Sequence, residues 1–185
     1  MDKYFNQIIG TDIVTENGTL VGRVGDMVID PDTGKVLGFL LGFKNKKIIT
    51  PVDVLSWNQR MIIHDIDDVF DLEEIIKAEK VVKRNVCIMQ NKVVTKGGLY
   101  LGKVYDFSVH HQMFILTKIL ITKSFLGIFN YDKKIVAHHN ILEIKQEKII
   151  VKDPIQLIPV REKKASVPKA KLRVDIIPTG CRSNN

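Results

Sequence analysis

Cysteines and long apolar runs are both scarce in this chain of 185 residues. Its two cysteines, Cys87 and Cys181, are too few for a disulfide framework or a zinc knuckle. The longest apolar run, at 36–43, is far shorter than the roughly 20 residues that a membrane-spanning helix needs. The segment 1–7 lacks the basic-then-apolar pattern of a secretion signal. We therefore expect a cytoplasmic protein without a membrane-spanning helix.

Catalytic motifs are also missing from the sequence. We find no phosphate-binding glycine loop, no nucleophile elbow and no paired general acid and base at recognisable spacing. Asp26 and Asp106 are lone carboxylates, and we expect them to hydrogen-bond to the backbone at a barrel corner. Asp30 and Asp32 lack the further oxygens that calcium needs, so we interpret them as turn residues. The sequence predicts a non-enzymatic protein with no cofactor.

Four of the five histidines form two pairs in the C-terminal half, His110-His111 and His138-His139. Adjacent residues on a strand point to opposite faces, so each pair would supply at most one inward zinc ligand. No cysteine or carboxylate has ligand spacing with them. We expect exposed turn histidines and no metal site.

The chain contains an internal sequence repeat. Residues 14–26 recur at 94–106, and residues 46–49 and 54–55 correspond to 133–136 and 141–142. An internal repeat of this kind predicts two structural units of about 80 residues. The shared residues that we expect to serve the fold are Gly18, Gly22 and Asp26 in the first unit and Gly98, Gly102 and Asp106 in the second.

Short strands separated by turns are expected in each unit. In the first, residues 20–29 and 36–43 form a predicted hairpin around the turn at 30–34, where Gly34 accepts a positive φ. Further strands are expected at 48–54 and 61–64. Trp57 corresponds to Ile144 and is predicted to pack in the core or between the units.

A short helix is expected to link the two units. Asp71 as N-cap and Glu74 at the third helical position fit a capping box, and Leu72, Ile75 and Ile76 would line one helical face. The corresponding segment after the second unit, 152–159, contains two prolines and is expected to be extended.

The spacing of Gly18, Gly22, Val24 and Asp26, followed by the turn at 30–34, resembles the PRC-barrel family. The second unit resembles it less closely, because it lacks that turn. The resemblance implies a small β-barrel, as in the photosynthetic reaction-centre H subunit, a ribosome maturation factor and stand-alone bacterial proteins, that docks other proteins. The predicted fold is all-β, with a barrel domain at 1–80, a second at 81–160 and a basic, disordered tail at 161–185.

An insertion of eight residues distinguishes the second unit, within 122–131. It is too apolar to stay in water without a reason. One interpretation is that this loop covers the other barrel or closes its own. The other is that it docks a protein partner through Phe125, Leu126, Ile128, Phe129 and Tyr131.

The tail carries most of the net charge of +7, since residues 161–185 alone contribute +5. Its candidate residues for a nucleic-acid or anionic surface are Lys163, Lys164, Lys169, Lys171 and Arg173. The segment 172–177 could add as a strand to a partner's sheet edge. The tail has no aromatic residue for base stacking, and the units lack an obvious basic stripe.

Together these features favour a cytoplasmic adaptor that holds a protein partner of unknown identity. The alternative is a factor that associates with RNA or the ribosome through its basic tail, with salt-sensitive affinity. Contact of the tail with anionic lipid is a third possibility, at about 1 kcal/mol per basic residue. A homo-oligomer is also possible.

Overall fold

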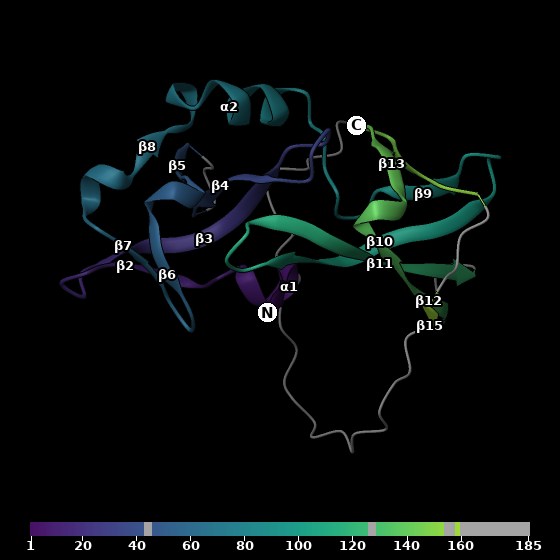
Figure 1. The fold of residues 1–185 in the computed structure, drawn as a ribbon, viewed down its shortest axis with the longest axis horizontal. Coiled ribbons are helices and arrows are strands. Elements are labelled where there is room, and N and C mark those ends of the chain that lie inside the picture. The colour runs from purple at the N-terminus through teal and green to yellow at the C-terminus, as the bar shows by residue number, and fades with distance from the viewer. Residues whose placement is uncertain (43–45, 126–128, 154–157, 160–185) are drawn as a thin grey trace, which may run out of the picture.

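The computed structural model describes residues 1–42, 46–125, 129–153 and 158–159, and at 124–132 and 158–159 it describes the backbone alone. The chain is mostly strands, arranged in two curled sheets with few helices (Figure 1). This arrangement confirms the predicted all-β class.

The first sheet has the strand order β6-β7-β2-β3-β4-β5-β8. Its strands are β2 (Asp12–Thr15), β3 (Leu20–Ile29), β4 (Val36–Leu41), β5 (Lys47–Ile49), β6 (Val54–Trp57), β7 (Met61–Ile63) and β8 (Phe70–Asp71). The long β3 curls because its registers with β2 and β4 both shift along its length.

The second sheet has the order β13-β14-β9-β10-β11-β12-β15, and β1 also pairs with β10. Its strands are β1 (Asp2–Tyr4), β9 (Lys92–Thr95), β10 (Tyr100–His110), β11 (Ile115–Phe125), β12 (Phe129–Ala137), β13 (Ile141–Ile144), β14 (Lys148–Val151) and β15 (Ile158–Pro159). Because β1 precedes every strand of the first sheet, the start of the chain crosses over to the second.

The helices are few and short. They are α1 (Phe5–Ile8), α2 (Ile76–Lys83) and the 3-10 turns η1 (Pro51–Asp53), η2 (Ile66–Asp68), η3 (Leu72–Glu74) and η4 (His138–Asn140). In Figure 1, α2 lies along one side of the first sheet, above β4.

The two sheets repeat the same local backbone bonds 80 positions apart. Gly18 N donates to Thr15 O at 2.8 Å, and Gly98 N donates to Thr95 O at 2.9 Å. Both glycines have a positive φ, +81° and +89°, which other residues rarely adopt. The shared glycines therefore close the same turn in each half.

The linking helix begins later than the sequence suggests. Asp71 N donates to Glu74 Oε2 at 3.1 Å, so the capping box stabilises the 3-10 turn η3, and the α-helix starts only at Ile76. The predicted apolar face is wrong at Ile76, whose side chain is 64% exposed. Ala78 and Val81 face the first sheet instead, since the helix is rotated by the preceding turn.

A single cluster of buried residues runs through both sheets. It includes Ile13, Phe39 and Met61 from the first sheet and Val93, Ile119 and Ile149 from the second, all without measurable exposure. A smaller cluster lies under α2. The two halves therefore share one hydrophobic core.

Candidate functional site

The junction between the sheets is built from two hairpin turns that pair with each other. Val36 N donates to Phe114 O, and Leu116 N donates to Gly34 O, each at 2.8 Å. Lys35 and Ile115, which are 80 positions apart, form the isolated antiparallel bridge at the centre. The two turns thus pair through corresponding residues, each 80 positions apart.

Aromatic side chains from both halves pack together at this junction. Phe114 from the second sheet stacks on Trp57, with ring centroids 5.9 Å apart, and meets Phe39 edge-on at 6.1 Å. Trp57 is 4% exposed, which confirms the predicted packing between the halves.

The entry segment of the chain is fixed to the second sheet by Asp106. Its Oδ1 accepts hydrogen bonds from Phe107 N at 2.9 Å and from Asn6 N at 3.3 Å, so it caps α1. Burial raises the pKa of Asp106 above its usual value, although the hydrogen bonds from Phe107, Asn6 and Phe5 lower it. The corresponding Asp26 Oδ1 accepts from Met27 N at 2.7 Å.

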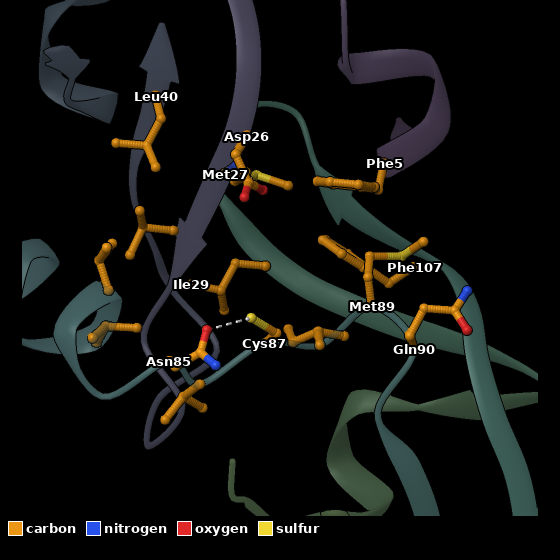
Figure 2. A pocket seen from close by; sticks show the side chains of 15 residues that line it. Phe5, Asp26, Met27, Ile29, Leu40, Asn85, Cys87, Met89, Gln90 and Phe107 are labelled. Carbon is orange, nitrogen blue, oxygen red and sulfur yellow. Dashed lines mark hydrogen bonds between the residues drawn. The ribbon is translucent and has the colours of Figure 1, made fainter. Parts of the chain in front are cut away.

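An apolar cavity of about 120 Å³ opens at the same junction. Figure 2 shows the rings of Phe5 and Phe107 side by side at its edge, with centroids 4.8 Å apart, and Met27 and Met89 pointing inward. The amides of Asn85 and Gln90 and the carboxylate of Asp26 also line it. Its size is on the order of the 150 Å³ cavity that holds a benzene molecule, so it suits one small apolar group.

The predicted turn residues Asp30 and Asp32 lie where the β3 strand ends. Asp30 Oδ1 accepts from Asp32 N at 3.1 Å, and Oδ2 accepts from Thr33 Oγ1 and from Lys77 Nζ, both at 2.6 Å. The carboxylate of Asp30 is thus occupied by the turn itself and by α2.

The second histidine pair lies on a turn, as expected, although His138 is half-buried and not exposed. His138 and His139 lie on the 3-10 turn η4, not on a strand, because Ala137 ends β12. The His138 ring lies against Gly34, where a Cβ would collide with Nε2. Burial, together with His139, lowers the pKa of His138. Within the described ranges, no group of three His, Cys, Asp or Glu side chains could hold a metal ion.

The predicted partner-binding segment forms a hairpin, which corrects the expected loop. β11 and β12 continue as paired strands through Lys123↔Tyr131 and Phe125↔Phe129. Leu126 and Ile128 lie outside the described residues. We refer to residues 122–131 as the β11–β12 arm.

The predicted tail residues Lys163, Lys164, Lys169, Lys171 and Arg173 all lie outside the described residues. No helix in the described part of the chain combines the length and apolar character required to cross a bilayer.

These observations define an all-β protein with two curled sheets, a shared core and two hairpin turns that pair with each other. Residues 1–74 match the family model of the PRC-barrel domain. The match supports, for this segment, the family resemblance that its glycine spacing suggests. A comparison with the curated proteins gives no match for the chain.

Proposed function

We propose that this chain is a non-enzymatic adaptor that docks a protein partner through the β11–β12 arm. The PRC-barrel domain at 1–74 supports a role as a small interaction module. The second half, with its matching bonds 80 positions later, would be a second barrel of the same kind. The proposal keeps the cytoplasmic location expected from the sequence, which fractionation of source cells would test.

The extended hairpin carries this proposal. β11 and β12 contain 11 and 9 residues, whereas the corresponding β4 and β5 contain 6 and 3. A barrel like the first half needs no such extension. Its sequence is rich in phenylalanine, leucine and isoleucine, which are costly to leave in water.

The arm also rises from a rigid base. Ile119 and Ile121 of β11 and Val136 of β12 have no measurable exposure and belong to the shared core. A recognition element held by a packed base loses less conformational entropy on binding than a mobile loop does. The packed base of the arm therefore favours a role in docking.

A capture experiment tests the proposal. The tagged full chain would be compared with a Phe125→Ser, Phe129→Ser variant in nuclease-treated lysate of source cells. We expect the variant to lose specific protein partners while its melting temperature changes little. Leu55→Ser is the matched control, because Leu55 is an exposed apolar residue of the first sheet at 53% exposure. A large fall in melting temperature with unchanged capture would show that the arm serves the fold.

A further inference from the structure

The two halves of the body carry opposite charge. Residues 1–80 contain nine basic and fourteen acidic residues, whereas residues 81–160 contain twelve basic and five acidic ones. A nearly neutral body thus divides into an acidic half and a basic half. In Figure 1, β9 and β13 lie at the end of the molecule opposite to β6 and β7.

Three lysines form a row across the second sheet. Lys148 of β14 lies opposite Lys92 of β9, and Lys92 lies opposite Lys103 of β10. All three are exposed, while the residues that follow them on each strand are fully buried. Since side chains alternate along a strand, the three lysines project from one outer face. Neighbouring strands are about 4.8 Å apart, so the charges are closely spaced.

No acidic side chain in the described structure pairs with the lysine row. Like charges directly opposite each other destabilise a sheet. The ammonium groups of Lys92, Lys103 and Lys148 have neither a hydrogen-bond nor an ion-pair partner in the described structure. The nearby Lys145 differs, since its Nζ pairs with Glu143 Oε2 at 2.6 Å.

At the corresponding positions of the first sheet, the charges neutralise each other. Asp12 and Arg23, which correspond to Lys92 and Lys103, are also cross-strand partners. Arg23 Nε donates to Asp12 Oδ1 at 2.8 Å. The second half has therefore replaced an internal ion pair with two like charges at the same backbone positions.

An apolar row runs beside the lysines on the same face. Tyr100 lies opposite Val94, and Val94 lies opposite Ile150, two positions along from the lysine row. Tyr100 is 39% exposed, and the Lys123 ammonium lies 6.0 Å from its ring centroid. Cations beside an aromatic ring on a sheet surface are the usual components of a platform for stacked bases.

We propose that this face, the lysine row with Tyr100 beside it, binds the backbone and bases of single-stranded nucleic acid. Lysines neutralise phosphates, and Tyr100 offers a ring on which one base stacks. An acidic protein or an anionic membrane would use the lysines but would have no need of the exposed ring. The three lysines and Tyr100 lie outside the β11–β12 arm, although Lys123 of the arm approaches the Tyr100 ring. The proposal adds to the adaptor role and does not depend on it.

The test measures binding of a fluorescent oligouridine 12-mer to the full chain over a salt series. Lys92→Asp recreates the Asp12–Arg23 arrangement, so the variant is expected to fold at least as well as the parent. We expect roughly tenfold weaker binding at low salt and a salt slope reduced by at least about 1. Lys80→Glu, on exposed α2, makes the same charge change elsewhere and should alter affinity less than about twofold.

Two further probes separate nucleic acid from other polyanions. Tyr100→Ala should weaken oligouridine binding while leaving binding of polyglutamate and of phosphatidylserine vesicles unchanged. Three results would each overturn the proposal: equal losses in Lys92→Asp and Lys80→Glu, no effect of Tyr100→Ala on oligouridine, or no oligouridine binding at low salt.

Discussion

Phe114, in the turn between β10 and β11, packs against the first sheet. It stacks on Trp57, which comes from the first sheet and is the only tryptophan. It sits at a turn with a positive φ of 49°, in the position that Gly34 holds in the first half. The second half has thus exchanged a permissive turn residue for an anchoring side chain.

Phe114→Ala should lower the free energy of unfolding by about 3 kcal/mol, because it removes the ring that packs on both Trp57 and Phe39. The emission of Trp57 should also shift to the red in the folded state. Denaturant titration followed by fluorescence and by circular dichroism measures both effects. Met113→Ala is the control, since Met113 is 69% exposed, and it should change stability by less than about 0.5 kcal/mol. Equal stability of the two variants would contradict the packing described.

Gly34 and Gly18 provide a matched pair of glycines. Both have a positive φ, but a Cβ at Gly18 meets no atom within 4 Å, whereas a Cβ at Gly34 collides with the His138 ring. Gly18→Ala should cost about 1–2 kcal/mol for the backbone conformation alone. Gly34→Ala should cost more in thermal melts, and His138→Ala should recover the excess in a double-mutant cycle. No recovery would mean that the ring is not the cause.

His138 is expected to make stability depend on pH. Its pKa in the folded protein is below the ordinary value of 6.5, so between these two pKa values the unfolded chain binds a proton that the folded chain does not. Stability should therefore fall as the pH decreases from 6.5 towards the folded pKa. In chemical denaturation at a series of pH values, His138→Gln should flatten this part of the profile. An unchanged profile would contradict the burial of the ring.

Asp106 changes the pH dependence of stability in the opposite direction. Its pKa is raised above 3.8, so this carboxyl favours the folded state most at low pH and loses that contribution as the pH rises through the folded pKa. Substituting Asp106 and His138 one at a time therefore separates their opposite contributions to the pH dependence of stability.

At the scale of elements, the β11–β12 arm is the main departure from the repeated plan. Sequence alignment of the two halves locates an insertion but cannot give it a conformation, because its residues suit a strand as well as an apolar loop. The structure continues the two strands as a pair after a register shift between Ile121 and Lys123, with Lys123 opposite Tyr131. The extra residues lengthen existing strands and add no new element in the described part of the arm.

Shortening the arm should separate folding from docking. Replacing residues 124–130 by Asn-Gly joins Lys123 to Tyr131 through a two-residue turn that suits paired strands. We expect the melting temperature to stay within a few degrees, since the core residues of β11 lie nearer its base. Capture of protein partners should be lost. A collapse of thermal stability would instead assign the arm to the fold.

Other elements were predictable because their signals are local. The hairpin at 30–34 follows from proline, aspartate and glycine in turn order, and the strand at 20–29 is found as predicted. The strand expected at 36–43 is assigned only to Leu41. The face of α2 was predicted wrongly, because its rotation depends on how the 3-10 turn before it meets the sheet.

At the scale of the whole molecule, the sequence reveals the duplication but not how its halves interlock. The pairing of β1 with β10 and the bridge between Lys35 and Ile115 join residues far apart in the chain. No local pattern specifies such contacts. The lysine row was missed for the same reason, since Lys92, Lys103 and Lys148 become neighbours only when three strands align.

The interlocked contacts also bear on the domain boundaries expected at 80 and 160. Asp106 caps α1, Phe114 packs on Trp57 and the buried cluster includes both sheets. An isolated first half would expose the faces of Phe39 and Trp57 that Phe114 covers. We therefore expect the halves to unfold together.

Differential scanning calorimetry of the full chain tests this cooperativity most directly. One shared core predicts a single transition in which the calorimetric and van't Hoff enthalpies agree. Trp57 fluorescence should follow the same transition, since it reports the contact between the halves. Two resolved transitions, or a van't Hoff enthalpy near half the calorimetric value, would contradict a single folded unit carrying both the arm and the lysine row.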